Sequence, residues 1–480
     1  IRFEKPINAK GMENKIIIVY EEFKANERSV DVQSVSEKDR ITTASYKAKN
    51  SIKNDVTYGT HKLLVAAECA IQNPSWKYYE PIIKNYPNYR ITDSRFELHL
   101  SPKQFNIESE GIDHFIGTIA GDILDNSNIE KISVSDFRFP EGMSYIFPGP
   151  NLGSDKILEL FREPKINHCM HSKDTKLYKD KNQSSDTINR PLVAFSYKPR
   201  MGYSISEFET LYKLAAESGV DIIEDDERMI DPIYCPFEER IKIAAKLQET
   251  YKHTKFSANI TGSLEKAKER LEIAHINGIK FVKIDVLVTG FETLRQIACL
   301  IRDRNLEMGI TVYPDTKTYR KLSREFILKM SRLCGADIIY AGSPYWSRDL
   351  KDYQPIYSAM DELYERHAML RSEIPWCPNL KRTIPTLTND FNFNYCELVT
   401  AYLKKHYNHT NYAFFIGGGI SAFPTTISDA VKITISATEH AVQFDFNSGS
   451  KYKPYELDQK TEEKLRSNNW SILDVSGVLK

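Results

Sequence analysis

The stretch Val220-Asp221-Ile222-Ile223-Glu224-Asp225-Asp226-Glu227 begins as an apolar run and ends in four consecutive acidic residues. Neighbouring carboxylates repel one another, so such a run at a strand end lowers stability unless a cation or lysines offset the charge. Because side chains alternate along a strand, Glu224 and Asp226 share one face, and Glu227 can turn in from the following loop. Two or three carboxylates at one point suit a hard cation such as Mg²⁺. The competing interpretation is a solvated acidic turn before a helix.

This strand belongs to a regular series. From Arg190 onward, short apolar strands alternate with amphipathic helices, and eight of each is the pattern of a (β/α)₈ TIM barrel. The expected strands are Val193–Lys198, Asp221–Asp225, Phe256–Ile260, Phe281–Leu287, Met308–Tyr313, Asp337–Ala341, Thr383–Leu387 and Ala413–Ile416. The expected helices are Ser206–Ser218, Phe237–Tyr251, Leu264–Ile276, Glu292–Arg304, Lys317–Cys334, Tyr353–Leu370, Tyr395–His406 and Thr425–Gln443. In such a barrel, catalytic residues lie at the carboxyl ends of the strands.

The chain before the barrel has a mixed pattern of strands and helices, which predicts an α+β module. Its helix-like segments are Lys62–Asn73 and Ile112–Leu124, and its strand-like segments include Lys15–Tyr20, Arg95–Leu100 and Ile129–Asp136. The sequence therefore predicts an N-terminal α+β domain over 1–162, a polar insertion or linker over 163–189, the barrel over 190–443 and a polar C-terminal tail over 444–480.

Composition narrows the classes of function. Lys and Arg total 65 and Asp and Glu total 65, so the net charge of zero provides no electrostatic footprint for nucleic acid or for an anionic membrane. No apolar run has the length needed to span a bilayer, and the first residues do not have a secretory pattern. The seven scattered cysteines favour a reducing compartment, and we expect a cytoplasmic protein.

Polar residues gather at the predicted carboxyl ends of the barrel strands. In chain order these are Lys198 and Arg200, then Glu224, Asp226 and Glu227, then Ser257 and Asn259, Lys283 and Asp285, Tyr313, Tyr340, Thr388, and Gly417-Gly418-Gly419. A glycine run after a strand leaves backbone N–H groups free to bind an anion, although it also marks tight turns. Lys198 could equally be a surface lysine, the tyrosines core aromatics, and Asp285 a partner of Lys283.

These residues together resemble the large subunit of ribulose-bisphosphate carboxylase. The resemblance rests on an ordered set of segments: Lys198-Pro199-Arg200-Met201-Gly202-Tyr203-Ser204, Asp221 to Glu227, Asn259-Ile260-Thr261, Ala341-Gly342 and Phe415 to Gly419. Before the barrel, Phe147-Pro148-Gly149-Pro150 resembles the family's domain junction, and Ala66-Ala67-Glu68 and Thr118 to Asp122 resemble its substrate-covering segments. The resemblance covers nearly the whole chain and implies the same two-domain fold.

The departures from the family pattern bear on activity. In true carboxylases the position of Glu224 is a lysine that reacts with CO₂ to form a metal-binding carbamate, and glutamate cannot do this. The loop Gly342-Ser343-Pro344-Tyr345-Trp346-Ser347 lacks the family's CO₂-polarising lysine. Phosphate-site residues are also replaced, by Tyr313-Pro314, Tyr340 and Thr388-Asn389-Asp390, and the asparagine of the N-terminal lid is Asp122. The resemblance therefore implies a RuBisCO-like protein that does not fix CO₂.

For this protein, the resemblance implies a Mg²⁺-dependent enolase, isomerase or decarboxylase of a sugar-derived carbonyl compound with one phosphate or carboxylate. Glu224, Asp226 and Glu227 are the expected metal ligands, and Lys198, Glu224, Lys283 and Tyr313 the expected catalytic residues. Arg200, Asn259, Tyr340, Thr388, Gly417, Gly418 and Gly419 are expected to bind the substrate. Head-to-tail homodimers, alone or assembled into larger oligomers, would bring Glu68 and Asp122 into the partner's site.

Two other functions fit the same residues. In a metal-free enzyme, Lys283 would neutralise the acidic cluster in place of Mg²⁺ or form a Schiff base with a carbonyl substrate. In a binding or regulatory protein, the replaced residues would mark the loss of chemistry.

Overall fold

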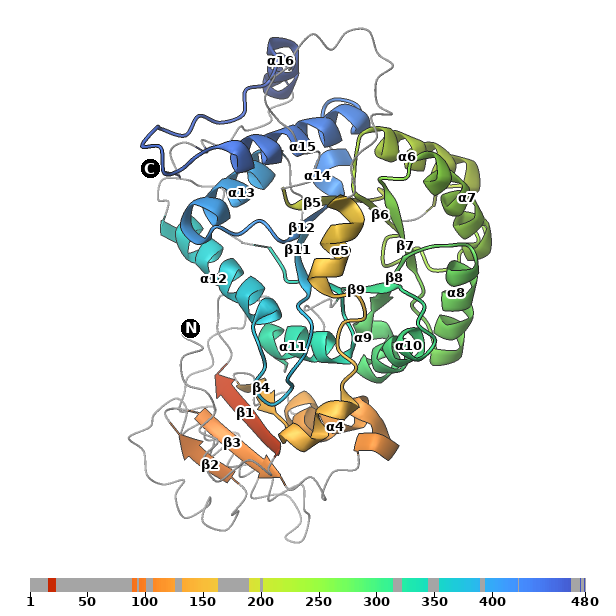
Figure 1. Ribbon diagram of the computed structural model, residues 1–480, viewed down its shortest axis with the longest axis vertical. Helices are drawn as coiled ribbons and strands as arrows, with labels where there is room; N and C mark the ends of the chain where they lie inside the picture. The colour runs from red at the N-terminus through yellow and green to blue at the C-terminus, as the bar shows by residue number, and fades with distance from the viewer. Residues whose placement is uncertain are drawn as a thin grey trace.

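The structure is a computed structural model that describes residues 16–22, 89–92, 95–100, 107–125, 132–162, 190–198, 202–313, 322–343, 354–388, 393–421, 423–467, 475 and 479. Figure 1 shows a small sheet with a helix beside it and a larger barrel of strands surrounded by helices. The predicted α/β class and TIM barrel are thus confirmed. The predicted insertion 163–189 lies outside the described residues.

The N-terminal unit is a four-stranded antiparallel sheet in the order β2-β3-β1-β4. Its strands are β1 (Ile16–Glu22), β2 (Tyr89–Thr92), β3 (Arg95–Leu100) and β4 (Ile132–Arg138). Helix α4 (Ile107–Asp125) packs against β4 and is kinked at Gly111, whose φ of 83° lies in the left-handed region that favours glycine. The 3₁₀ helix η2 (Glu141–Ile146) leads toward the barrel.

Side-chain to backbone hydrogen bonds fix this unit to the helical layer of the barrel. The carboxylate of Asp113 accepts from the backbone N–H groups of Phe291 (2.8 Å) and Glu292 (3.1 Å), at the start of α10 (Phe291–Asp303). These N–H groups have no partner within their own helix, so Asp113 satisfies them. Lys329 of α11 (Arg324–Cys334) pairs with Asp136 of β4 at 2.6 Å. The two units therefore share polar as well as apolar contacts.

Eight parallel strands close the barrel in chain order. They are β5 (Leu192–Ser196), β6 (Ile222–Glu224), β7 (Lys255–Asn259), β8 (Phe281–Asp285), β9 (Gly309–Tyr313), β10 (Ile338–Tyr340), β11 (Ile384–Thr388) and β12 (Ala413–Ile416). The other helices around them are α6 (Ile205–Glu217), α7 (Phe237–Thr250), α8 (Leu264–Ile276), α12 (Gln354–Arg371), α13 (Phe393–Tyr407), α14 (Gly418–Ser421) and α15 (Ile427–Gln443).

Several strands end earlier than expected, and one of them does so because its end becomes a helix cap. The strand expected over Phe281–Leu287 ends at Asp285, and α9 (Val286–Thr289) follows at once. The Asp285 side chain accepts a hydrogen bond from the N–H of Leu287 at 3.0 Å, as an N-cap does. The backbone N–H of Asp285 in turn donates to the hydroxyl of Thr261, which ties the strand end to the neighbouring loop.

Helix α5 (Gly153–Arg162) covers the amino-terminal end of the barrel and packs its apolar side into the barrel interior (Figure 1). The Phe161 ring stacks on Phe281 with centroids 6.2 Å apart. The buried carboxylate of Asp337 accepts from the N–H groups of Leu152 (2.7 Å), Gly153 (2.8 Å) and, in the barrel wall, Ile310 (2.9 Å). One side chain therefore joins the start of α5 to the barrel.

The C-terminal tail returns over the outside of the barrel and includes α16 (Gln459–Ser467). Buried Glu397 of α13 accepts from the hydroxyl of Tyr452 at 2.7 Å and from the N–H of Tyr455 at 2.6 Å, so part of this polar tail is packed against the barrel helices. Across the described ranges, none of the helices is both long and apolar enough to cross a membrane.

Asp337→Asn is expected to lower the free energy of unfolding by about 1–3 kcal/mol, because the amide provides one acceptor oxygen where the carboxylate provides two. Three backbone N–H groups donate to the two oxygens of Asp337. In the variant, the amide N–H₂ would stand in place of one of these oxygens and could not accept a hydrogen bond. Urea denaturation of both chains measures the difference. Asp303→Asn, at an exposed position of α10, is the matched control, and an equal loss in both variants would contradict the role of Asp337.

Candidate functional site

The carboxyl ends of the barrel strands bring most of the predicted site residues together. Five of them are the last residues of their strands: Glu224 of β6, Asn259 of β7, Tyr313 of β9, Tyr340 of β10 and Thr388 of β11. Lys283 lies within β8. The others follow strand ends, and they are Lys198, Asp226, Glu227 and Gly417 to Gly419. Because the strands are parallel, all these positions lie at one end of the barrel. Arg200 and Glu68 lie outside the described residues, and Asp122 lies in α4 of the N-terminal unit.

A buried ion pair occupies the centre of this end. Lys283 Nζ lies 2.7 Å from Glu224 Oε1, and both side chains are almost completely inaccessible to solvent. Tyr340 donates its hydroxyl to the same oxygen at 2.6 Å. Glu227 Oε2 lies 3.7 Å from the lysine, and the Lys283 ammonium also donates to the backbone carbonyl of Asp225 at 3.2 Å. One lysine therefore offsets two of the four consecutive acidic residues.

Two aromatic rings enclose the lysine. Tyr313 and Tyr340 meet edge to face with centroids 4.8 Å apart. Lys283 Nζ lies 5.3 Å from the first ring centroid and 5.5 Å from the second, within the range of a cation–π contact. The rings thus favour a positive charge at this position and exclude water from it.

The charge on Lys283 is retained despite its burial. Desolvation opposes the charged form, but the carboxylates of Glu224 and Glu227 outweigh it, and the pKa of Lys283 is raised. Burial, and then the charge of Glu224, raise the pKa of the Tyr340 hydroxyl, which stays a donor. Because a Schiff base requires an uncharged amine, this arrangement disfavours Lys283 as a nucleophile.

A second lysine lies nearer to solvent. Lys198 Nζ is 2.6 Å from Asp226 Oδ2, and the lysine side chain is 21% exposed while the carboxylate is fully buried. Gly417 lies against this lysine: a Cβ there would be 3.0 Å from Lys198 Cε and 3.1 Å from the carbonyl oxygen of Ser196. The glycine after β12 therefore leaves the room in which Lys198 reaches Asp226.

Asn259 uses its amide to hold the acidic loop. Its Nδ2 donates to the carbonyl oxygens of Asp226 and Glu227, both at 3.0 Å, and its Oδ1 accepts from the N–H of Thr261 at 3.1 Å. These bonds use both amide protons, so in this arrangement Asn259 has no amide proton left to donate to a substrate.

Asp225 has a structural role on the opposite face of the strand. It pairs with Arg240 of α7 at 3.2 Å, and both side chains are fully buried. Arg240 also donates to the backbone carbonyls of Met229 and Ile230. Alternation along the strand places Asp225 away from the barrel axis, so only Glu224, Asp226 and Glu227 remain for chemistry.

The predicted Mg²⁺ ligands do not fit a metal ion as they are arranged. Glu224 and Glu227 share Lys283, and Asp226 is paired with Lys198. Over the part of the chain that the structure describes, no three His, Cys, Asp or Glu side chains form a group that could hold a metal ion. Glu224 Oε2 is the carboxylate oxygen of this cluster that is buried without a hydrogen-bond partner among the same residues, and the Lys283 ammonium already lies beside that carboxylate. The cation at this strand end is an ammonium group.

A comparison with protein families gives the context for this site. A family model described as ribulose bisphosphate carboxylase large chain, catalytic domain, matches residues 179–462. The chain belongs to the ribulose bisphosphate carboxylase large-chain family. The resemblance stated from the sequence is thereby confirmed, and the residues described above, from Lys198 to Gly419, lie within the matched range.

Curated relatives in this family include proteins with two different names. Ribulose bisphosphate carboxylase of Thermococcus kodakarensis is 27% identical over 273 residues, which cover 54% of this chain and 55% of the relative. The 2,3-diketo-5-methylthiopentyl-1-phosphate enolase of Geobacillus kaustophilus is 25% identical over 277 residues, which cover 55% of this chain and 60% of the relative. The alignments thus span little more than half the length of these relatives.

Solved structures share the fold at low identity. The octameric Rubisco of Pyrococcus horikoshii matches with a TM-score of 0.61 at 17% identity, covering 98% of this chain and 96% of that one. A dimeric archaeal Rubisco from Hyperthermus butylicus matches with a TM-score of 0.61 at 18% identity, covering 96% of this chain and 97% of that one. Both the N-terminal unit and the barrel are therefore arranged as in Rubisco large chains.

Lys283→Met is expected to lower the free energy of unfolding by about 3–5 kcal/mol, because it leaves the buried carboxyl group of Glu224 without its cation. The same change frees Glu224 and Glu227 to bind a divalent cation. We therefore expect Mg²⁺ to raise the thermal unfolding midpoint of this variant and to leave that of the wild-type chain unchanged.

The double variant Glu224→Gln with Lys283→Met is the control, since it removes both charges of the pair. It should regain part of the lost stability and should not respond to Mg²⁺. Equal stabilisation of the wild-type chain by Mg²⁺ would show that the metal displaces Lys283.

Proposed function

We propose that this protein catalyses proton transfer next to a carbonyl group, as an enolase or isomerase, and does not fix CO₂. The substrate class is a sugar-derived carbonyl compound with one phosphate or carboxylate. The observation that carries this proposal is the Lys198–Asp226 pair at the open end of the barrel, where a base can meet a substrate. Gly417, which lies against Lys198, links that base to the glycine run after β12.

Lys198 is the residue to which we assign the proton transfer. Lys198 first passes its ammonium proton to Asp226, and the uncharged Nζ then takes a proton from the carbon beside the carbonyl. The electron pair of that C–H bond forms a C–C double bond, and the π pair of the carbonyl moves onto its oxygen to give an enolate. The resulting ammonium group returns a proton to a carbon or an oxygen of the intermediate. Asp226, 2.6 Å away, orients the amine and stabilises the ammonium form.

The anionic end of the substrate is assigned to the glycine run. Gly417, Gly418 and Gly419 follow β12 and begin α14, where backbone N–H groups have no partner within the helix. This places the anion beside Lys198, so the carbonyl of a short sugar derivative would lie near Nζ. Tyr313 and Tyr340, which replace residues of the family's other phosphate site, leave one anionic end to be bound.

We assign the cation of this site to Lys283 and propose catalysis without Mg²⁺. A Mg²⁺ ion bound by Glu224 and Glu227 would lie beside the Lys283 ammonium, which already interacts with both carboxylates, and the two cations would repel each other. In this proposal Glu224, Lys283 and Tyr340 form a rigid, charged floor beneath the reacting groups, and Tyr313 covers its edge.

The relatives support the class of reaction and the assembly. The relative from Geobacillus kaustophilus is named as an enolase of a phosphorylated diketone, which is a small carbonyl compound with one phosphate. Structures with this fold include a dimeric and an octameric Rubisco. We propose a homodimer, or an assembly of such dimers, in which Glu68 and Asp122 complete the partner's site.

A second candidate function is a binding or regulatory protein without chemistry. It is favoured by the mutual pairing of Glu224 and Lys283, because two buried charges that satisfy each other need no substrate. In that case the open end of the barrel would still bind a small anion but would not transfer a proton.

Lys198→Met is expected to slow the exchange of substrate C–H protons with D₂O by at least about 100-fold, because it removes the proposed base. Exchange is followed by NMR on a panel of phosphorylated ketoses and lactones, and it should persist in EDTA. Lys213→Met, in an exposed pair with Glu209, is the matched control and should exchange at the wild-type rate. If the wild-type protein binds a compound of this panel but does not exchange its C–H protons, the result supports the second candidate function instead.

The wild-type protein is expected to form no labelled, acid-stable product from ribulose bisphosphate and radioactive bicarbonate, with or without Mg²⁺. The position where true carboxylases carry the carbamate-forming lysine is Glu224, and a glutamate forms no carbamate. Incorporation above that of the Lys198→Met variant would refute this part of the proposal.

A further inference from the structure

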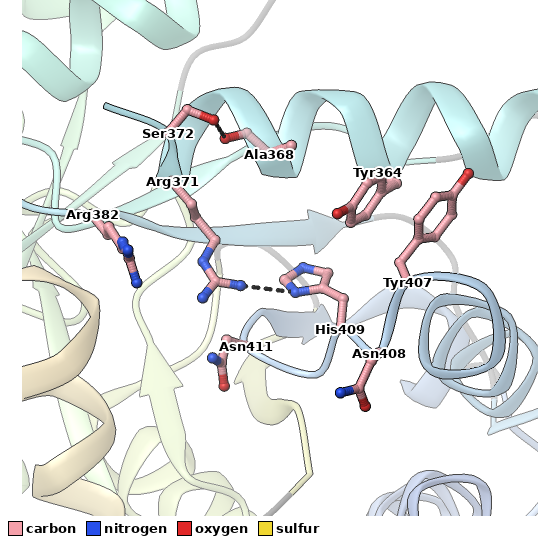
Figure 2. Close-up of a pocket in the computed structure, with 9 residues that line it drawn as sticks. All are labelled: Tyr364, Ala368, Arg371, Ser372, Arg382, Tyr407, Asn408, His409 and Asn411. Carbon is pink, nitrogen blue, oxygen red and sulfur yellow. Dashed lines mark hydrogen bonds between the residues drawn. The ribbon is translucent and has the colours of Figure 1, made fainter. Parts of the chain in front are cut away.

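We infer that the barrel carries a second binding site, for a phosphate-bearing small molecule, at the end opposite the proposed catalytic residues. The site is a cavity of about 310 Å³ between the end of α12 and the starts of β11 and β12 (Figure 2). Arg371 is the last residue of α12, Arg382 precedes β11, and Asn411 precedes β12. Since strands start at this end, the cavity is separated from Lys198 by the length of the barrel.

The cavity contains two guanidinium groups, those of Arg371 and Arg382. In the described ranges, no carboxylate forms an ion pair with Arg371 or Arg382, and Arg371 Nε is buried without a hydrogen-bond partner. Burial, and next the charge of Arg382, lower the pKa of Arg371, and Asp155 of α5 opposes this only in part. An anion placed between the two groups would offset both charges.

Two histidines hold Arg371 in place. Arg371 Nη1 lies 2.9 Å from His409 Nδ1, and His409 Nε2 lies 3.1 Å from His367 Nδ1 (Figure 2 shows the first contact as a dashed line). Since the arginine can only donate, His409 accepts through Nδ1 and donates through Nε2 to His367. Burial, and then the charge of Arg371, lower the pKa of His409 to about 3, so the histidine is neutral. The positive charge of the cavity therefore comes from the arginines.

The rest of the lining is suited to the organic part of a ligand. Tyr364 and Tyr407 stack with ring centroids 3.7 Å apart and an interplanar angle of 8°, which gives the cavity a rigid aromatic edge. The amides of Asn408 and Asn411 add hydrogen-bond donors and acceptors.

The class of ligand follows from this chemistry. Guanidinium groups bind phosphate through two parallel N–H bonds, and a pair of them at one cavity is suited to a dianion. A volume of about 310 Å³ is at the lower end for small-molecule sites, which fits a compact phosphate ester. This inference does not depend on the proposed function, because no residue of the cavity belongs to the open end of the barrel.

Calorimetric titration of inorganic phosphate into the full chain at constant ionic strength tests the site. We expect saturable binding that Arg382→Gln and Arg371→Gln each weaken by at least about 10-fold, as expected for the loss of a charged hydrogen-bond donor. Arg382 is exposed, so its variant should keep the wild-type unfolding midpoint. A phosphate monoester should bind with the same dependence on both arginines.

Two further variants separate this cavity from other sources of binding. Arg466→Gln makes the same charge change on α16 and should leave phosphate affinity unchanged. Lys198→Met changes the other anion site, beside the glycine run, and should leave unchanged the part of the phosphate binding that depends on the two arginines. The inference is overturned if no saturable binding is found below about 10 mM. It is also overturned if Lys198→Met abolishes binding that Arg382→Gln and Arg371→Gln leave intact.

Discussion

The buried pair of Lys283 and Glu224 is the constraint on which the catalytic end of this barrel depends. A charged group that is buried away from solvent needs a partner of opposite charge. Here Lys283 and Glu224 are that partner for each other, at 2.7 Å. Tyr340 adds a hydrogen bond to the same carboxylate, and Glu227 turns toward the same lysine. The two tyrosines lie against this pair, and Asn259 holds the backbone of the acidic loop that carries Glu227. The residues left able to meet a substrate are those around Lys198.

Much of this arrangement could be predicted from the sequence. The alternation of apolar strands with amphipathic helices predicted the barrel, and parallel strands necessarily bring Lys198, Glu224 and Lys283 to one end. The side-chain period of two also separates Asp225 from its neighbours Glu224 and Asp226. The sequence alone did not decide between a metal ion and Lys283 as the partner of Glu224. That choice depends on a distance across the barrel between residues far apart in the chain.

Other features depend on contacts for which the sequence has no local signal. Asp337 accepts hydrogen bonds from residues near 152, on a helix that covers the barrel, and nothing near Asp337 in the chain indicates this. The cavity of Arg371, Arg382 and His409 is assembled from three separate segments, each of which is an ordinary loop or helix end in the sequence. The end of β8 at Asp285 is a further case, since an acidic residue at a strand end can cap a helix as readily as it can bind a ligand.

The pairing of Glu224 with Lys283 also restricts which substitutions the fold tolerates at these two positions. In the carboxylases that the chain resembles, the position of Glu224 is a lysine. Replacing Glu224 alone by lysine would place two ammonium groups at the centre of the barrel, where one would have to lose its proton or the fold would lose stability. Replacing Lys283 alone would leave a carboxylate buried without its partner. Each single substitution therefore lowers stability, and a lysine at position 224 requires a second change at position 283, on another strand. The ion pair thus makes these two positions interdependent.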